Sequence, residues 1–130
     1  VYNGKGSAIG VPVAVIVNEN SASASEILAA AIQENEIGVV VGTNTYGKGV
    51  VQTTSYIEST GGWLKITTDA YYTPNGNNIN GVGISPDILM ELPEQYRRMA
   101  IPELVKNHQK EDTQLWEALD YVRERANEVS

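Results

Sequence analysis

The chain lacks cysteine and phenylalanine, and it has few basic residues. Without cysteine, its 130 residues can hold no disulfide, no thiolate metal site and no cysteine nucleophile. No apolar run approaches the ~18 residues of a membrane-spanning helix. Nine Lys and Arg against sixteen Asp and Glu give a net charge of −7. This balance argues against nucleic-acid binding, because that function needs a basic face.

The residues that are present suffice for one globular domain. Hydrophobic residues make up 42% of the chain and charged residues 19%, which is typical of a soluble domain with a sizeable core. The chain begins at Val1, with neither Met nor a signal peptide. We therefore expect it to be a piece of a longer protein.

The first half of the chain predicts a strand, a short helix and a second strand. After a polar lead-in over residues 1–10, residues 11–17 (VPVAVIV) are apolar and β-branched, as in a strand buried on both faces. Apolar residues then recur at helical spacing from Ile27 to about Asn35, and residues 37–41 (IGVVV) predict another buried strand. This order favours a right-handed crossover with a parallel pair, so the predicted fold class is α/β.

The second half predicts a β-rich segment followed by a C-terminal helix. Alternating or β-branched residues predict strands at 50–57, 63–68, 70–73 and, as a short edge strand, 88–92. Residues 106–112 have the composition of a linker. Asp112 or Thr113 would then cap a helix. Its apolar side would carry Leu115, Trp116, Leu119 and Val122.

A serine-rich turn, residues 18–26 (NENSASASE), stands where the first strand meets the helix. The free amides of a helix's first turn point toward such a turn. They can stabilise the oxyanion that forms on an attacked carbonyl. The alternative is a plain helix cap, because Ser23 and Glu26 fit the S-x-x-E capping box. Chemistry alone does not choose among Ser21, Ser23 and Ser25.

One lysine, Lys48, lies between two glycines in the loop after the second strand. An amine can activate a serine if it is kept neutral, and a lysine that acts as a base needs a pKa of roughly 7–8. Apolar residues at 39–41 and 50–51 predict an inward, desolvated side chain. The alternative is an exposed loop lysine. Gln52 would share a face with Lys48 in an extended segment, where it could hold the amine or simply face solvent.

The same loop nearly matches the phosphate-binding pattern G-x-x-x-x-G-K-[ST], from Gly42 to Lys48. Gly49 stands where the metal-coordinating hydroxyl should be. The residues that follow predict a strand, whereas this pattern opens a helix. A nucleotide-binding module is therefore disfavoured.

Three ordered blocks give the chain a resemblance to a known family. They are residues 13–26 (VAVIVNENSASASE), 41–53 (VGTNTYGKGVVQT) and 65–87 (KITTDAYYTPNGNNINGVGISPD). In this order and spacing they resemble the carboxyl-terminal processing (tail-specific) serine proteases over about residues 12–91, with a weaker match in the final helix. The resemblance implies a ClpP/crotonase-like α/β core.

The resemblance also implies roles for particular residues. Ser23 would be the nucleophile, Lys48 the general base, and Gln52 the residue that orients the lysine. The amide of Ala24 would be one oxyanion donor, and a glycine in a segment upstream of this chain would be the second. Asn77 departs from the arginine that the family often has at that position.

The implied activity is that of a serine endopeptidase that cleaves proteins near their C-termini through an acyl-enzyme. It needs no metal and no cofactor. The implied partners are protein or peptide tails, and self-association into a homo-oligomer is also expected. The full-length protein would be secreted, periplasmic or membrane-associated. His108, the only histidine, has no role in this activity and is expected to be solvated.

The implied division places a partial protease core in residues 1–92, and a linker with the C-terminal helix in residues 93–130. A PDZ domain that binds substrate tails and half of the oxyanion hole would lie upstream, so we expect the piece to be inactive alone. The alternative function is a non-catalytic ligand-binding or scaffold domain on the same fold. The joint presence of Ser23, Lys48 and Gln52 favours the enzyme.

Overall fold

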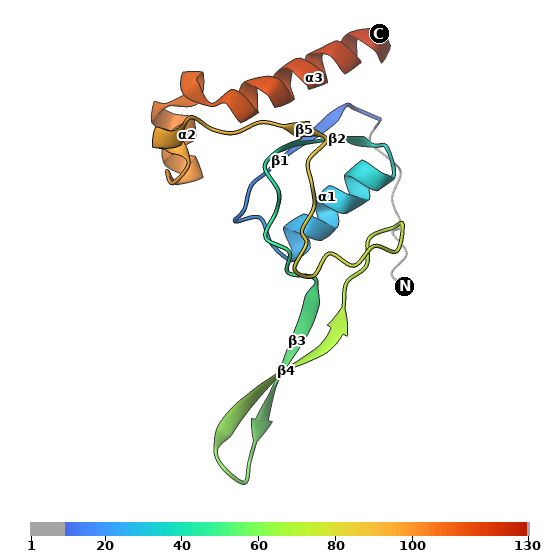
Figure 1. The fold of residues 1–130 in the computed structure, drawn as a ribbon, viewed down its shortest axis with the longest axis vertical. Coiled ribbons are helices and arrows are strands. Elements are labelled where there is room, and N and C mark those ends of the chain that lie inside the picture. The colour runs from blue at the N-terminus through green and yellow to red at the C-terminus, as the bar shows by residue number, and fades with distance from the viewer. Residues whose placement is uncertain (1–9, 130) are drawn as a thin grey trace.

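A computed structural model of the chain describes residues 10–129, which form an α/β body with a projecting β-ribbon (Figure 1). The lead-in expected before Gly10 lies outside the described residues. The elements of the body are β1 (Val13–Val17), α1 (Ala24–Glu34), β2 (Gly38–Gly42), β5 (Ile88–Leu89) and α3 (Thr113–Val129).

The sheet of the body is parallel, in the order β1–β2–β5. Along β1 and β2, Val13 pairs with Gly38 and Val17 with Gly42, and β5 continues the sheet beside the end of β2. The predicted strand–helix–strand unit with its parallel pair is therefore confirmed. The expected edge strand at 88–92 is present but only two residues long.

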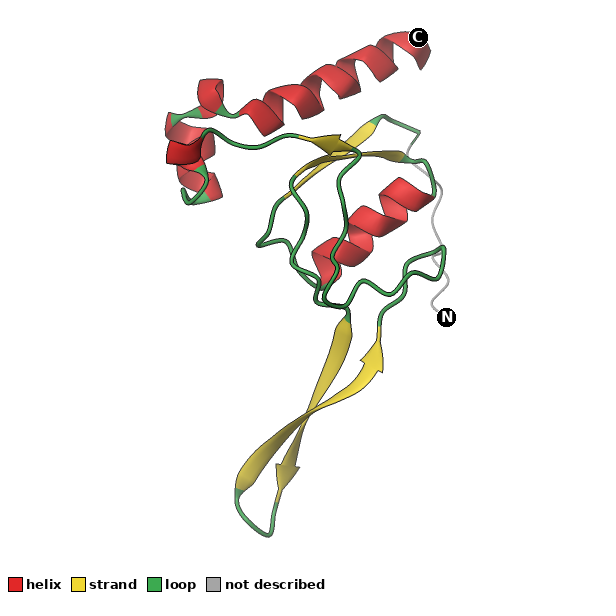
Figure 2. Ribbon diagram, viewed as in Figure 1, coloured by secondary structure: helices red, strands yellow, loops and turns green. Residues whose placement is uncertain are grey.

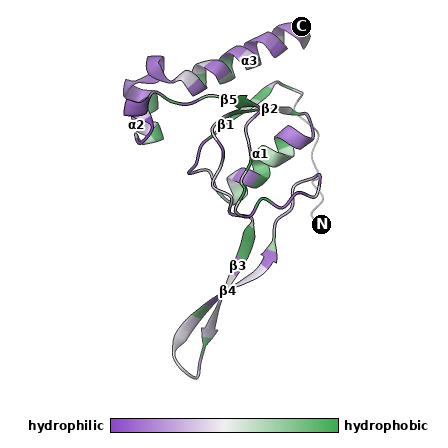
Figure 3. Cartoon of the chain, viewed as in Figure 1, coloured by the Kyte–Doolittle hydropathy of each residue, from purple (hydrophilic) through white to green (hydrophobic). Residues whose placement is uncertain are grey.

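Two helices cover opposite faces of this sheet, so neighbouring strand residues enter different cores. Val40 packs with Ala29 of α1, whereas Val41 packs with Ala118 of α3. This alternation follows from the two-residue period of a strand. Figure 1 shows the sheet between the two helices, and Figure 3 shows the sheet largely hydrophobic and α3 mostly hydrophilic.

The β-ribbon consists of β3 (Val50–Ile57) and β4 (Gly62–Ala70), which pair antiparallel in a sheet of their own (Figure 2). The strand predicted at 63–68 lies within β4. The strand predicted at 70–73 is not formed, because β4 ends at Ala70 and Tyr72 makes only an isolated bridge to Asn78. Most ribbon side chains are exposed, and Trp63 is 71% exposed beside Tyr56. The ribbon is therefore held by main-chain pairing and a few cross-strand contacts.

The C-terminal region contains more helix than the sequence predicted. A helix, α2 (Ile101–Asn107), overlaps the start of the linker expected at 106–112, and short 3₁₀ turns flank it at Glu94–Tyr96 and Gln109–Glu111. The sequence did not reveal α2 because its seven residues bury one apolar side chain, Leu104, and give little periodicity. Within residues 10–129, no helix has both the length and the apolar run to cross a bilayer.

The cap of α3 is confirmed, but its buried face differs from the predicted one. The Asp112 carboxylate accepts the Leu115 N–H at 2.9 Å, which is an N-cap arrangement. Ala118 is buried against the sheet, whereas Trp116 is 39% exposed. The prediction was wrong for Trp116 because the close approach of the helix to the sheet favours a small residue at the contact and leaves the indole outside.

Candidate active site

The serine turn links β1 to α1 and places Ser23 at the helix N-cap. The Ser23 backbone, with φ of 59° and ψ of −115°, lies in a region that residues other than glycine rarely adopt. Among residues 10–129, the only other non-glycine residue with a positive φ is Glu36. A strained strand-to-helix turn of this kind exposes the nucleophilic serine of α/β-hydrolases. The backbone therefore singles out Ser23 among the three serines.

The hydroxyls of the other two serines are engaged with the main chain. Ser25 donates its hydroxyl to the Ala22 carbonyl at 2.7 Å, and the Ser21 hydroxyl accepts the Asn18 N–H at 3.1 Å. Both bonds are local and stabilise the turn.

Ala24 is the first residue of α1, so its N–H has no acceptor within the helix. Ala24 is exposed, and the positive end of the helix dipole lies at the same place. An amide in this position can stabilise negative charge on an oxygen held beside Ser23.

The lysine loop, residues 43–49, follows β2, and burial alternates along its second half. Thr45, Gly47 and Gly49 are buried, whereas Tyr46 and Lys48 between them are exposed. The sequence predicted an inward, desolvated Lys48, and this prediction is wrong for the described residues. The inward positions are filled by a threonine and two glycines, which leaves the lysine side chain on the outer face.

Both glycines beside the lysine are needed for close backbone contact. A Cβ on Gly47, whose φ is 87°, would lie 2.9 Å from the Gly83 nitrogen, and a Cβ on Gly49 would lie 2.6 Å from the Asn80 nitrogen. The Gly47 carbonyl also accepts the Gly81 N–H at 2.8 Å. The main chain around the lysine is thus fixed against the 79–83 segment, while its side chain points outward.

A buried carboxylate, Glu26, joins the serine turn to the lysine loop. Glu26 is 0% exposed. Its Oε2 accepts the N–H groups of Ser23 and Lys48, each at 2.8 Å. Its Oε1 accepts the Gly47 N–H and the Thr45 hydroxyl, each at 2.6 Å. Because one oxygen holds both amides, the amide nitrogens of Ser23 and Lys48 lie no more than twice 2.8 Å apart.

The environment of Glu26 favours its charged form. Burial alone would raise the pKa of this carboxyl, but the hydrogen bonds from Thr45, Gly47, Lys48 and Ser23 outweigh burial and hold the pKa below its usual value. Among the ion pairs of the described residues, none involves Glu26. The four donors and the helix N-terminus therefore balance its charge. The sequence revealed the bond to Ser23 through the capping box, but not the other three.

Gln52 lies on β3, exposed and opposite Thr67 of β4. It stands near the start of the ribbon, four residues beyond Lys48, whose side chain is also exposed. The structure thus brings the main chains of Ser23, Ala24 and Lys48 together. The role of Gln52 in orienting the lysine stays a prediction.

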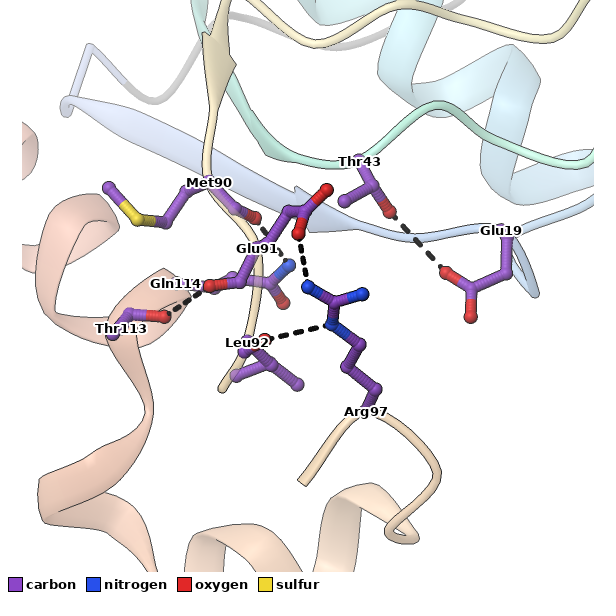
Figure 4. Close-up of polar contacts among 8 residues, drawn as sticks. All are labelled: Glu19, Thr43, Met90, Glu91, Leu92, Arg97, Thr113 and Gln114. Atoms are coloured by element: carbon purple, nitrogen blue, oxygen red, sulfur yellow. Dashed lines mark hydrogen bonds and ion pairs between the residues drawn. The ribbon is translucent and has the colours of Figure 1, made fainter. Parts of the chain in front are cut away.

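A hollow of ≈310 Å³, whose lining residues are mostly of polar types, lies at the carboxyl ends of β1 and β2 (Figure 4). The Arg97 guanidinium pairs with Glu91 and donates to the Leu92 carbonyl at 3.1 Å. Across the hollow, Glu19 accepts the Thr43 hydroxyl at 3.4 Å. Because its arginine is already paired and carboxylates outnumber it, the hollow is better suited to holding this segment against the sheet than to binding an anion.

Asn77, where the family resemblance implies an arginine, contacts the end of α1 that is remote from Ser23. Its side-chain amide donates to Glu34 Oε1 at 3.1 Å, and the Asn75 N–H donates to Glu34 Oε2 at 2.7 Å. Glu34 is the last residue of α1, about 17 Å from Ser23 at a rise of ~1.5 Å per residue. Asn77 therefore acts on the anchoring of its own loop, well away from the serine turn.

Residues 10–129 contain no cluster that could hold a metal ion, and their one histidine packs beside a tyrosine. No group of three or more His, Cys, Asp or Glu within residues 10–129 is placed to hold a metal ion. His108 is half-buried beside Tyr96, with ring centroids 5.0 Å apart. It is less solvated than predicted because it stands at the end of α2.

Comparison with known sequences places the chain among peptidases. The sequence model of Peptidase family S41 matches residues 2–90. The carboxy-terminal-processing protease of Bartonella bacilliformis is 48% identical over 88 residues, which cover 66% of this chain and 20% of that protein. The chloroplastic C-terminal processing peptidase of Tetradesmus obliquus is 39% identical over 93 residues, which cover 70% of this chain and 20% of that protein. The chain thus spans about a fifth of the length of these relatives.

Solved structures agree on the fold. The photosystem II D1 C-terminal processing protease is 40% identical with a TM-score of 0.60, over 65% of this chain and 22% of that one. The tricorn protease is 23% identical with a TM-score of 0.60, and the match covers 86% of this chain and 10% of the tricorn chain. At this identity the match is evidence for the fold and for nothing further. The predicted α/β class with a ClpP/crotonase-like core is confirmed.

Proposed function

The chain belongs to peptidase family S41, and from this membership we propose that the whole protein is a serine endopeptidase that cleaves proteins near their C-termini. The observation that carries the proposal is the strained Ser23 turn, whose amide shares the Glu26 Oε2 with the Lys48 amide. The relatives described above are named as C-terminal processing proteases or peptidases, which supports a peptidase that acts near the C-termini of proteins.

In the proposed mechanism, the Ser23 Oγ attacks the scissile carbonyl carbon while the Lys48 amine takes the hydroxyl proton. The oxyanion of the tetrahedral intermediate accepts the Ala24 N–H. Collapse of the intermediate breaks the C–N bond, and Lys48 returns the proton to the leaving amine. Water then attacks the acyl ester, again with the lysine as base, and frees Ser23. Gln52 would hold the amine through its side-chain carbonyl, and no step uses a metal or a cofactor.

The exposed Lys48 side chain needs a cover before it can act as a base, because lysines that activate a nucleophile lie in sites from which water is excluded. We propose that other parts of the protein provide this cover and the second oxyanion donor, and that a PDZ domain binds substrate tails. Residues 1–92 would be part of the protease core, and residues 93–130 a linker and a helix. The 130-residue chain would be inactive by itself.

The proposed substrates are unstructured protein or peptide tails. A homo-oligomer is supported by the exposed apolar side chains of the ribbon, of which Trp63 and Leu64 are examples. The Tetradesmus relative is named chloroplastic. For the whole protein we propose an extracytoplasmic location, whether secreted, periplasmic or membrane-associated.

The test uses the whole protein and an unstructured peptide that ends in apolar residues. We expect turnover to fall at least about 1,000-fold in Ser23→Ala and in Lys48→Met, because nucleophile and base act as a unit. Ser25→Ala is the matched control, since that hydroxyl is bonded to the Ala22 carbonyl. We expect the Ser25→Ala rate within about twofold of wild type. Turnover retained in Ser23→Ala contradicts the proposal, and turnover by the 130-residue chain contradicts its inactivity.

A further inference from the structure

We propose that Glu26 is a positioning residue of the active site, whose buried carboxylate sets the serine turn and the lysine loop in register. The inference rests on the proposed function of Ser23 and Lys48. The contacts of Glu26 are with main-chain amides and one hydroxyl. It therefore acts through the main chain of the residues that carry the chemistry.

The Glu26 carboxylate does more than cap its helix. In a capping box the glutamate side chain accepts only the N–H three residues earlier, which here is the N–H of Ser23. The other three bonds reach Thr45, Gly47 and Lys48, which lie 19, 21 and 22 residues further along the chain. In a simple cap the second oxygen would face solvent, whereas here both oxygens of Glu26 are occupied by donors.

An ionised carboxylate suits all four partners, because each of them donates. Its two oxygens offer about four lone pairs. A glutamine at this position would keep one acceptor oxygen and turn an NH₂ group toward two of the donors. Buried donors that lose their acceptor disfavour the packed arrangement. Glu26→Gln is thus a nearly isosteric change that shifts the two segments relative to each other.

A second bridge keeps the two segments adjacent when Glu26 is changed. The Tyr46 N–H donates to the Ser21 carbonyl at 2.9 Å, at the edge of the same contact. The Thr45 hydroxyl also accepts the Ile84 N–H at 2.7 Å. The lysine loop therefore stays attached to the body without the carboxylate. What Glu26 adds is the alignment of Ser23 with Lys48 on one oxygen.

Glu34 offers a matched control on the same helix. Like Glu26, it is a carboxylate of α1 that accepts N–H groups from a later loop, those of Asn75 and Asn77. It lies at the end of α1 opposite Ser23. If holding a loop onto α1 were the whole role of Glu26, the two substitutions to glutamine would change turnover alike.

The test compares Glu26→Gln with Glu34→Gln in the whole protein, with kcat and KM for the apolar-tailed peptide corrected for the folded fraction. We expect Glu26→Gln to lower kcat about 100-fold with KM within about twofold, because misplaced reacting groups slow the chemical step. We expect Glu34→Gln to leave both constants within about twofold. Equal effects of the two substitutions, or a raised KM with unchanged kcat in Glu26→Gln, overturn the positioning role.

A second pair of variants serves if Glu26→Gln does not fold. Thr45→Val removes one donor to Glu26 and also the acceptor of the Ile84 N–H, whereas Thr45→Ser keeps the hydroxyl that makes both bonds. We expect kcat to fall about tenfold in Thr45→Val and to recover to within about twofold of wild type in Thr45→Ser. Equal kcat values in the two variants contradict the inference.

Ser23→Ala in the same series separates the two proposals. If wild type cleaves the peptide and Ser23→Ala does not, the proposed function stands whatever the Glu26 variants show. If Ser23→Ala matches wild type, the proposed function fails, and the positioning role fails with it.

Discussion

The two ends of helix α1 use the same chemistry with different consequences. At the N-terminal end, Glu26 is fully buried and accepts four donors. At the C-terminal end, Glu34 is half-buried and holds Asn75 and Asn77. Burial alone would raise the pKa of either carboxyl, and hydrogen bonds outweigh it in both. Water can replace the bonds of Glu34 but not those of Glu26, so the same interaction is decisive only where solvent is excluded.

The largest expected effect is on stability at the buried end. We expect Glu26→Gln to lower the free energy of unfolding by about 3 kcal/mol, because buried N–H groups lose their acceptor. Glu34→Gln should cost about 0.5 kcal/mol, since water takes the place of the carboxylate. Urea denaturation of the whole protein, with hydrogen exchange at the Gly47 and Lys48 amides, measures both. Equal losses would remove the contrast between the two ends.

A pair of glycines extends the contrast to the main chain. Gly83, with φ of 77°, would place a Cβ 2.4 Å from the Thr45 carbonyl oxygen, whereas Gly76, with φ of 82°, has open space around it. We expect Gly83→Ala to cost about 2–4 kcal/mol, from backbone strain and overpacking. Gly76→Ala should cost about 1 kcal/mol, from strain alone. Thermal unfolding of the two variants ranks them, and a larger loss in Gly76→Ala would contradict the packing account.

The pH dependence of stability should also differ between the ends. The folded-state pKa of Glu26 lies below its usual value of 4.5. The stability it contributes is therefore present above that value and is lost as the pH falls through the folded-state pKa. We expect wild type to lose more stability than Glu26→Gln when the pH is lowered from neutrality to about 3. Identical pH slopes for the two proteins would show that the carboxylate contributes no charge-dependent stability.

The smallest expected effect is at Asn77, which contacts the solvent-accessible C-terminal end of α1. Asn77→Arg introduces the residue that the family resemblance implies at this position, and it replaces an exposed hydrogen bond to Glu34 with an exposed ion pair. We expect the free energy of unfolding to change by no more than about 0.5 kcal/mol, and kcat to stay within about twofold. A loss of turnover in Asn77→Arg would place this loop in the substrate path, in disagreement with its position at the far end of α1.

Local patterns in the sequence predicted the parts of the fold that depend on near neighbours. The apolar runs gave β1 and β2 and their parallel pairing, and the S-x-x-E spacing gave the bond between Glu26 and Ser23. The alternation gave the ribbon, although neither the end of β4 at Ala70 nor the register shift in its pairing with β3 was readable. Both periodicity and capping act within a few residues, which is why they could be read from a single sequence.

The parts that could not be predicted depend on contacts between distant segments. The outward direction of Lys48 follows from the packing of Gly47 against Gly83 and of Gly49 against Asn80, and apolar flanks do not reveal that packing. The three remaining partners of Glu26 lie in another loop. The positive φ of Ser23 is a backbone property that the identity of a serine does not predict.

The most direct test of the account is mass spectrometry that identifies the modified residue, on whole protein quenched while it turns over an apolar-tailed peptide ester. We expect an acyl adduct on the peptide that contains Ser23, which disappears in Lys48→Met together with turnover. An adduct on Ser21 or Ser25, or undiminished turnover in Lys48→Met, would contradict the assignment of nucleophile and base.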